Sequence, residues 1–595
     1  MKKIYLMALT AGLMFASCSD FLDREPITDP SSSTYLSTPS QIENYINGLY
    51  TQLPSLAKFG MGVRGEEKNS DNILSEKYDT RLNGETTLFD GALDWENGYK
   101  YLRNVNYFFK NYRVDEKTLG ENSDIQSFKG EAYFLRAYWH FFLLKKFGSI
   151  PYMDTLMDEN ATVDGLQIPA KPRNEVAKLI LEDLNQAISL LYPRSKYSGL
   201  RINKEAAMVF AMNVALYEGT WEKYHANDDF AAETNESAYF LGEVVRIGDE
   251  LFQMGITLND NDEKTGFGSL FNSKDLSDVN EVLFWKKYSD AEGVFHALSG
   301  LLAGGVVDQD APAGLSQELV DNFLYLNGTF INPSNADFKD FNKTFENRDN
   351  RLLQMVMHSG AKFRSPEKGA KPMLVEVYTE TNKDEVNPPY LAGDGQSRNI
   401  TGYHIRLGID ENYVEGNGET ALPIIRYAEA LLDYAEAKAE LDACDASVLE
   451  KTIKPLRERA GVTYVTPMED PNFSDFGYEI SPELQEIRRE RRSELSLQGF
   501  RLDDLMRWAA HKLIVNKRGK GAYLGKESVL YKSLSEEKRT IVDSRTLVND
   551  EGWMDPLSQL LPNGYQFKPN RDYLLPIPPT ELSLNKQLHQ NPNWE

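Results

Sequence analysis

The segment Ser123–Phe147 limits the fold of this chain more than any other part of the sequence. Its first residue and Gln126 have the spacing of a capping box, which marks the start of a helix. Apolar side chains then recur at steps of three and four, at Ile125, Phe128, Ala132, Leu135, Trp139 and Phe142. Gly148 and Pro151 supply the end of the helix. The pattern predicts one long helix whose apolar face must be covered by other elements.

Further segments have a helical period, and they fall in pairs along the sequence. They are Ser40–Leu56, Glu96–Tyr112, Arg173–Leu191, Lys204–Gly219, Ser237–Met254, Thr420–Leu441 and Asp445–Ala460. In the segment 420–441, Pro423 suits a position in the first turn, and the many alanines would let another helix approach closely. Antiparallel helix pairs in series are typical of tetratricopeptide-like repeats. We therefore expect a mainly α fold built on a tetratricopeptide-like helical-repeat scaffold.

Between residues 255 and 419 the composition changes. Gly, Asn, Asp and Pro become frequent, and the apolar runs shorten. Two short runs, Glu281–Trp285 and Tyr403–Leu407, have the composition of strands. Loop-rich segments on a rigid scaffold are where binding usually takes place. The sequence therefore predicts an irregular, loop-rich half with small β elements, and places ligand binding there.

The N-terminus has the layout of a secretory signal. Lys2 and Lys3 precede the uncharged apolar run Ile4–Phe15, which is shorter than the ~20 residues needed to span a bilayer. Cys18 follows two small residues and resembles the acylated cysteine of a bacterial lipobox. Several acyl chains would make such an anchor stable. The polar stretch Ser19–Thr38 then predicts a tether between the anchor and the folded body.

Cysteine usage gives no support to a disulfide framework. The sequence has two cysteines, Cys18 and Cys444, and acylation of the first would leave the second without a partner. We expect the fold to be held by its own apolar core, which a protein of 595 residues can readily supply.

The charge of the protein excludes a common class of partner. A formal net charge of −25 argues against nucleic acid, which requires a basic surface. The run Arg488–Arg492 could suggest such a surface, but in an acidic, exported protein a helix face with ion pairs is the better interpretation. Arg491, Arg501 and Arg507 are therefore predicted to be part of the scaffold.

No local motif for catalysis is present. The sequence lacks H-E-x-x-H, C-x-x-C, a P-loop, a G-x-S-x-G elbow and an EF-hand loop, and its seven histidines are scattered. Paired carboxylates could still serve a glycoside hydrolase, and with 90 acidic residues their proximity in sequence carries no information. We expect a non-enzyme without a metal or cofactor.

Several motifs together resemble the SusD/RagB family of outer-membrane lipoproteins. One is the helix Gly130–Tyr138 with its continuation Phe147–Tyr152, and others are Arg348–Leu352 and Thr401–Tyr403. Near the C-terminus the matching positions are Ile487, Glu490, Arg491, Glu494, Leu495, Gly499, Arg501, Asp504, Leu505, Arg507 and Trp508, and then Leu575–Pro578, Glu581, Asn585, Gln590–Pro592 and Trp594. Gln498 departs from the family, which usually has Glu there. The resemblance extends from Cys18 to Trp594.

The resemblance implies a tetratricopeptide-like half and an irregular half that carries the ligand site. It also implies a partner, a SusC-like TonB-dependent transporter, over which the protein would sit as a lid in a Bacteroidota-like outer membrane. Asp20 and Asp23 are similar to the acidic signal that sends such lipoproteins to the cell surface. The expected function is capture of a glycan for import by a surface-exposed, lipid-anchored protein.

Aromatic side chains are the best candidates for glycan contact, because sugar rings have apolar faces and polar edges. In SusD-like proteins the loop before the second helix contributes to the site, as does the region around Ser289–His296. We therefore predict a platform of Trp95, Trp285 and Tyr288. Its expected hydrogen-bonding neighbours are Arg81, Asn83 and Asn97. Trp553, in a loop with Gly and Pro, is a weaker candidate, and each aromatic could instead pack in the core.

Two other functions stay open. Some relatives serve peptide uptake, and a peptide would need backbone hydrogen bonds more than an aromatic surface. A lipoprotein hydrolase is the other alternative. The expected organisation is a signal peptide at 1–17, a lipidated tether at 18–38, an N-terminal helical part at 39–254, a loop-rich ligand-binding insertion at 255–419, and a C-terminal helical and terminal segment at 420–595.

Overall fold

The computed structural model describes most of the protein beyond the predicted tether. The described residues are 35–58, 61–114, 123–157, 160, 162, 164–259, 262–304, 306–308, 311–332, 339–358, 361–364, 373–375, 399–410 and 417–594. Cys18, the signal segment and most of the tether lie outside them. No helix among the described residues is long and apolar enough to cross a membrane.

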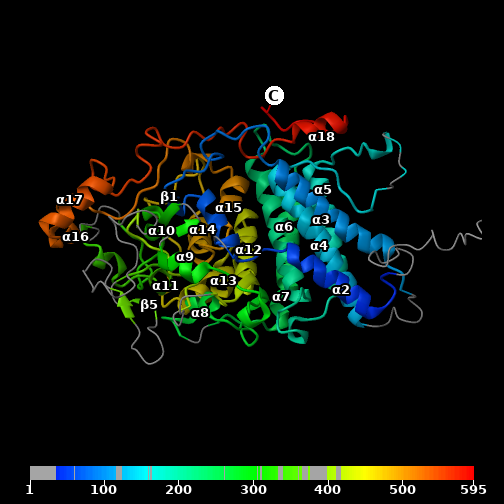
Figure 1. Ribbon diagram of the computed structural model, residues 1–595, viewed down its shortest axis with the longest axis horizontal. Helices are drawn as coiled ribbons and strands as arrows, with labels where there is room; N and C mark the ends of the chain where they lie inside the picture. The colour runs from blue at the N-terminus through cyan, green and yellow to red at the C-terminus, as the bar shows by residue number, and fades with distance from the viewer. Residues whose placement is uncertain are drawn as a thin grey trace, which may run out of the picture.

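Long antiparallel helices form one half of the molecule (Figure 1). They are α2 (Pro39–Leu49), α3 (Ala92–Asn111), α4 (Ser123–Phe147), α5 (Arg173–Leu190), α6 (Lys204–Tyr224), α7 (Ser237–Leu251), α12 (Tyr427–Glu440), α13 (Ala446–Arg459) and α14 (Pro482–Glu494). Neighbours pack in series from α3 to α7, and α12 then packs on α6, α7, α13 and α14. The predicted helical pairing is confirmed for α4 with α5, α6 with α7 and α12 with α13.

The predicted helix 420–441 is wrong at its start. Leu422–Arg426 forms strand β7, and the helix α12 begins only at Tyr427. Pro423 therefore lies in a strand opposite Trp285, where it is not in a helical first turn. The backbone N–H of Arg426 donates to the side chain of Glu429 at 2.6 Å, which closes the helix start at this later position.

Short strands and helices make up the irregular half. Its strands pair antiparallel as β1 (Ile73–Ser75) with β4 (Ala311–Leu315), β4 with β3 (Val306–Asp308), β2 (Val282–Lys286) with β7, and β5 (Ala361–Arg364) with β6 (Met373–Val375). Its helices are α8 (Gly266–Asn272), α9 (Leu298–Gly304), α10 (Gln317–Asn322), α11 (Asn350–Met355), α16 (Val529–Ser533) and α17 (Glu536–Arg545). Helices α15 (Arg501–Arg507) and α18 (Pro579–Leu584) pack on the helical half, since Leu505, Met506 and Leu582 lie against its core. The predicted strand at 281–285 is confirmed, whereas 403–407 forms a single bridge between Ile405 and Val356.

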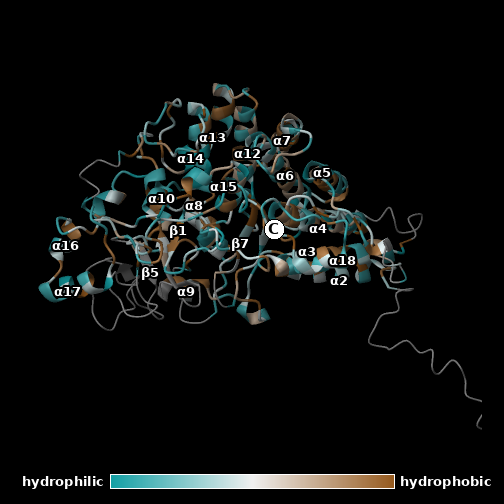
Figure 2. Cartoon of the chain, turned by 90° about the horizontal axis from the view of Figure 1, so that it is seen from above, coloured by the Kyte–Doolittle hydropathy of each residue, from teal (hydrophilic) through white to brown (hydrophobic). Residues whose placement is uncertain are grey.

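The two-stranded sheet β2–β7 separates the two larger apolar cores. Leu283 and Phe284 pack with the helical half, whereas Val282 and Trp285 pack with the irregular half. Side chains of one strand point to both faces of a sheet, so a sheet that packs against both cores carries apolar side chains on both faces. The charged residues Lys286 and Arg426 stand at the ends of the two strands. Figure 2 shows hydrophobic residues gathered on α5, α6 and α7, and hydrophilic ones on α17. The fold thus joins its two halves across one small sheet.

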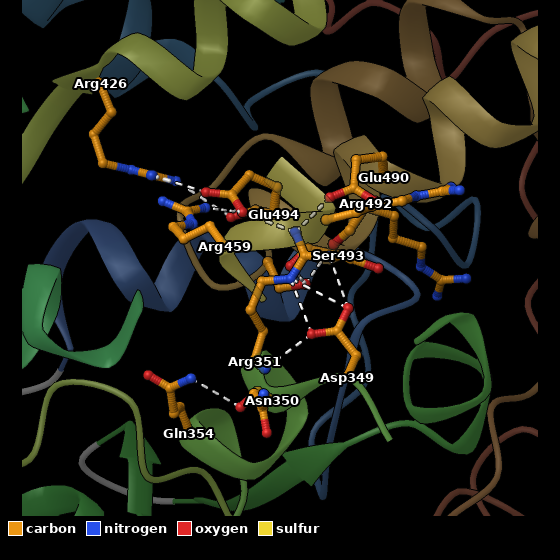
Figure 3. Close-up of polar contacts among 12 residues, drawn as sticks. Asp349, Asn350, Arg351, Gln354, Arg426, Arg459, Glu490, Arg492, Ser493 and Glu494 are labelled. Atoms are coloured by element: carbon orange, nitrogen blue, oxygen red, sulfur yellow. Dashed lines mark hydrogen bonds and ion pairs between the residues drawn. The ribbon is translucent and has the colours of Figure 1, made fainter. Parts of the chain in front are cut away.

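Buried ion pairs hold α14 between the two halves (Figure 3). Glu494 accepts hydrogen bonds from Arg351 at 2.8 Å, from Arg426 at 2.9 Å and from Arg459. Glu490 accepts from Arg351 at 2.6 Å. All these side chains are almost fully buried. The charged run on α14 is therefore an internal structure, which leaves no basic surface there.

The three arginines predicted to be scaffold are confirmed in that role. Arg491 pairs with Asp433 at 2.7 Å, Arg501 with Asp71 at 2.6 Å, and Arg507 with Glu436 at 2.6 Å. Gln498, the residue that departs from the family, accepts a hydrogen bond from Nε of Arg426 at 3.0 Å. Cys444 is a free, half-buried thiol.

Candidate ligand-binding site

Trp95 is buried at the start of α3. Only 5% of it is exposed, and its ring lies 5.1 Å from that of Phe147 and 4.9 Å from that of Tyr99, measured between centroids. The Trp95 side chain therefore packs α3 against the end of α4. In this structure its faces are taken up by other aromatic rings.

Trp285 and Tyr288 are buried as well, with exposed fractions of 1% and 4%. The indole N–H of Trp285 donates to the backbone oxygen of Ser198 at 2.8 Å. The hydroxyl of Tyr288 accepts from the backbone N–H of Leu56 at 2.6 Å. Both side chains lie in the core of the irregular half, because β2 is covered on both faces. The three aromatics do not form the exposed platform that the sequence predicts.

Arg81 and Asn83 tie their loop to the C-terminal segment. Arg81 donates to the backbone oxygens of Asp572 at 2.9 Å and Tyr573 at 2.8 Å. The amide oxygen of Asn83 accepts from the backbone N–H of Gln566 at 3.1 Å. Asn97 is half-buried on α3. The structure thus brings Arg81 and Asn83 together as anchors of the loop 77–94.

The same loop exposes apolar side chains that were not among the predicted site residues. Phe89 is 74% exposed, Leu93 68% and Leu88 37%. On the other predicted loop, 289–296, Val294 is 43% exposed. Trp553 is half-buried and packs edge-on against Tyr523 at 5.4 Å. The sequence did contain a sign that Phe89 is a candidate for ligand contact, because this aromatic residue lies in a loop that is otherwise rich in polar turn residues.

A cavity of about 210 Å³ lies between the helical half and the irregular half. Helices α4 and α6 form one wall, and β7, α15, the segment 497–500 and the turn around Arg64 form the other. Rim residues such as Phe142, Lys145 and Phe500 are half-buried, so the cavity opens to solvent. None of the predicted platform residues lines it.

Aromatic rings make up much of the cavity wall. Tyr138 and Phe210 stack with their centroids 5.5 Å apart, and Phe141 meets Phe210 edge-on at 5.6 Å. Phe142 and Phe500 complete the apolar lining. The predicted apolar stripe accounts for one face of α4, whereas α4 is aromatic on a second face as well. Phe134, Tyr138 and Phe141 of that second face line the cavity.

Polar groups of the cavity are partly paired. The side-chain nitrogen of Asn213 donates to Glu429 at 2.9 Å, and Lys145 forms an ion pair with Asp503. Burial raises the pKa of Glu429, although hydrogen bonds and nearby guanidinium groups oppose this. Arg64 and Tyr217 also line the cavity, and burial lowers the pKa of Arg64 to about 10. Aromatic faces beside a few polar atoms can bind a small polar molecule.

Possible metal ligands do not cluster in the described residues. No group of three or more His, Cys, Asp or Glu side chains could hold a metal ion within the described part of the sequence. His140, His225, His296 and His404 are buried, whereas His589 is exposed. His140 and His225 are hydrogen-bonded to neighbouring groups.

Comparison with known proteins agrees with the fold and with the binding role. Residues 310–594 match the model of the SusD family, and residues 20–216 match a model described as starch-binding, associating with the outer membrane. A SusD-like protein of Formosa agariphila is 23% identical over 99% of both chains.

Solved structures show the same fold. A SusD-like carbohydrate-binding protein of Bacteroides fragilis has a TM-score of 0.70 at 20% identity, over 93% of this chain and all of that one. A second SusD-like protein of Bacteroides fragilis has a TM-score of 0.68 at 22% identity, over 95% of this chain and 98% of that one. With two family models covering both ends and a relative along its whole length, the chain belongs to the SusD/RagB family of non-catalytic binding proteins.

Proposed function

We propose that this protein captures an oligo- or polysaccharide at the cell surface and delivers it to a SusC-like TonB-dependent transporter of the outer membrane. The observation that carries the proposal is the match of residues 20–216 to a family described as starch-binding and associated with the outer membrane. The match of residues 310–594 to the SusD family supports it. Acylation of Cys18 would anchor the protein, and the polar tether would hold the body in front of the membrane.

The proposed glycan face is formed by the loops 77–94 and 289–296. Phe89 is its most exposed aromatic residue and could stack on a sugar ring. Arg81 and Asn83 fix the first loop to the C-terminal segment. Trp95, Trp285 and Tyr288 would act from beneath, by holding the two loops in place; direct contact with glycan would require these side chains to leave the core.

Calorimetric titration of the mature protein with a panel of polysaccharides tests this function. We expect Phe89→Ala to weaken the binding of the preferred glycan about tenfold, since stacking of an aromatic ring contributes about 1 kcal/mol beyond its buried area. Val529→Ala is the matched control, because Val529 is 55% exposed on α16, at the other end of the molecule from α3 (Figure 1). Its affinity should equal that of the wild type.

Three results would each contradict one part of the proposal. Binding of peptides with no binding of any polysaccharide would replace glycan capture by peptide capture. A tagged form of this protein can be purified after mild detergent extraction of its native membrane. If the transporter does not copurify, delivery of the glycan to that transporter is contradicted. Equal affinities of wild type, Phe89→Ala and Trp95→Ala for a bound glycan would move the site away from these loops.

A further inference from the structure

The cavity between the two halves is separate from the proposed glycan face, since no residue of the loops 77–94 or 289–296 lines it. Much of its wall consists of buried side chains, which pack against one another and leave little surface for an occupant. The aromatic and charged side chains that line the cavity and stay partly exposed are Tyr138, Phe142, Lys145, Phe500 and Asp503, which we call the rim. These side chains decide what the cavity can bind.

Three of the rim residues supply aromatic rings. Tyr138 and Phe142 are four residues apart on α4, so they project from the same side of that helix. Phe500 comes from the other wall, directly before α15. An occupant of the cavity would therefore lie between rings that come from two walls. Accessible aromatic rings suit the apolar C–H face of a sugar.

The polar groups of the rim are accessible and incompletely paired. The ammonium group of Lys145 forms an ion pair with Oδ2 of Asp503, and the two side chains are 26% and 31% exposed. The other oxygen of this carboxylate, Oδ1, has no partner among the described residues, and neither has the hydroxyl of Tyr138. Both oxygens are in contact with solvent, since neither is a buried unpaired atom. Burial raises the pKa of Tyr138, so its hydroxyl keeps the proton and can donate it in a hydrogen bond.

This combination of groups matches the chemistry of hydroxyl groups. A sugar hydroxyl both donates and accepts a hydrogen bond. The carboxylate of Asp503 can only accept, the ammonium of Lys145 can only donate, and the hydroxyl of Tyr138 can do either. Neighbouring hydroxyl groups of one sugar ring could therefore bond to all three side chains at once.

The charges that an occupant can reach cancel. Lys145 and Asp503 neutralise each other at the rim. Three deeper guanidinium groups are each paired with a buried carboxylate; they belong to Arg426, Arg491 and Arg507. Arg64 has no carboxylate partner in the described part of the protein, but it is almost fully buried, beneath the rim. The rim thus favours an uncharged occupant, because a charged one would lose water without meeting an opposite charge.

The size of the cavity restricts the ligand further. About 210 Å³ is less than the ~300–1,000 Å³ of pockets for drug-sized molecules. The occupant is therefore small, on the scale of a single ring.

We infer that this cavity is a second carbohydrate site, and that it takes one uncharged sugar ring. The C–H face of the ring would lie against Phe142 and Phe500. Its hydroxyl groups would bond to Tyr138 and to the ion pair of Lys145 and Asp503. This site does not depend on the proposed glycan face.

Titration of the mature protein with D-glucose, D-galactose, D-mannose and D-xylose tests the inference. Cyclohexanol, D-glucuronate and D-galacturonate are the comparisons. Saturation-transfer NMR detects weak binding, and calorimetry measures the affinity. We expect at least one of the four uncharged sugars to bind several-fold more tightly than cyclohexanol, an apolar ring with one hydroxyl, since each further hydrogen bond adds affinity. The same sugar should bind more tightly than either uronate.

Three results of this titration would overturn the inference. They are failure of all four uncharged sugars to bind, tighter binding of a uronate, and equal or tighter binding of cyclohexanol. The last of these would show that the cavity accepts apolar rings in general.

Conservative variants place the sugar in the cavity. Tyr138→Phe removes an accessible hydroxyl that has no described partner, so stability should not fall while affinity for the sugar drops about three- to tenfold. Asp503→Asn keeps the shape of the side chain but removes its charge, and affinity should drop about tenfold, since hydrogen bonds to charged groups are the stronger ones. Tyr239→Phe on α7, at a tyrosine that is 48% exposed, is the matched control and should bind as the wild type does. A drop in either rim variant without one in the control supports the cavity, and unchanged affinity in both excludes it.

The outcomes for the two sites can be told apart. Phe89→Ala should leave binding of the free sugar unchanged, and Tyr138→Phe should leave binding of the polysaccharide unchanged. Loss of free-sugar binding in Phe89→Ala alone would move the sugar to the loops, which removes the cavity site and leaves the proposed function intact. Normal binding of the free sugar without any binding of polysaccharide would contradict the proposed function and support the cavity site.

Discussion

Glu494 is the carboxylate on which three buried arginines converge. Burial alone would raise its pKa, but Arg459, Arg426 and Arg351 lower the pKa to about 2. Its side chain is fully buried, so these contacts are not screened by water. A charge network of this kind is stable only while each member keeps its partners.

We expect Glu494→Gln to lower the free energy of unfolding by about 3–5 kcal/mol, because it leaves buried guanidinium charge without compensation. Urea denaturation followed by circular dichroism measures this. Glu250→Gln is the control, since Glu250 forms an exposed ion pair with Arg246 on α7 and should change stability by less than about 1 kcal/mol. Similar effects of the two changes would show that the network contributes little.

The same residue predicts a dependence on pH. The ordinary pKa of a glutamate is 4.5, and that of Glu494 in the fold is about 2. The unfolded protein therefore takes up the proton first, so the contribution of Glu494 is complete above pH 4.5 and is lost as the pH falls towards 2. Between these values, the slope of unfolding free energy against pH should be smaller in Glu494→Gln by up to about 1.4 kcal/mol per pH unit. Equal slopes would contradict this.

Sequence reasoning succeeded for residues whose role follows from charge balance. Arg491, Arg501 and Arg507 had to be paired in an acidic protein, and the structure pairs them. It was less successful with Trp95 and Trp285, because the residues around an aromatic side chain in the sequence do not show whether that side chain is buried in the fold. The environment of Arg64 could not be predicted, because its hydrogen-bond partner Leu407 lies 343 positions later in the sequence.

Helices α3 and α4 approach closely at Gly98. A Cβ atom at this position would lie 2.6 Å from Cδ2 and 2.7 Å from Cγ of Leu143, which is fully buried. The branch point of that leucine would have to move, so overpacking should outweigh the gain in helix propensity.

We expect Gly98→Ala to lower the unfolding free energy by about 1–2 kcal/mol. Gly242→Ala on α7 should raise it by up to about 1 kcal/mol, because nothing lies within 4 Å of its added Cβ atom. Thermal unfolding of the two variants side by side measures the difference. A gain of stability in Gly98→Ala would show that α3 and α4 can separate at little cost.

The sequence predicted a helix correctly where the helical spacing of apolar residues continued without interruption. The limits of α4 agree with the predicted segment at both ends, since its caps and stripe all indicate a helix. The start of α12 was missed because Leu422–Arg426 can continue a helical pattern. Only its pairing with β2, which lies far away in the sequence, makes it a strand.

At the scale of the molecule, two large apolar cores of the described residues meet at the sheet β2–β7, and a third, small cluster is formed by Leu324, Ala460 and Val462. The helical spacing of apolar residues predicted the helical half, and the loop-rich composition predicted the irregular half. The cavity at their junction could not be predicted, because its two walls come from segments that lie far apart in the sequence. Family resemblance supplied the overall arrangement that no single segment shows.

At this scale the anchor gives a further prediction. Cys18→Ala should release the protein from the outer-membrane fraction, since acylation requires the thiol, and should leave the folded body unchanged because the whole tether separates Cys18 from α2. Cell fractionation with metabolic labelling by palmitate measures both effects. Cys444→Ala is the control and should keep the label. A labelled, membrane-bound Cys18→Ala protein would exclude this anchor.

The hydrogen bonds of the loop 77–94 to the C-terminal segment also set an order of folding. Asn83 meets Gln566, 483 positions later, and Asp71 meets Arg501, 430 positions later. During synthesis from the N-terminus, α3 to α7 can pack at once, but this loop lacks its anchors until nearly the whole protein has emerged. The loop therefore cannot form these contacts before the C-terminal segment is available. In the meantime Leu88, Phe89 and Leu93 offer apolar surface to a chaperone or a protease, so the cell would need to protect the growing polypeptide at the very place where the finished protein is proposed to meet its ligand.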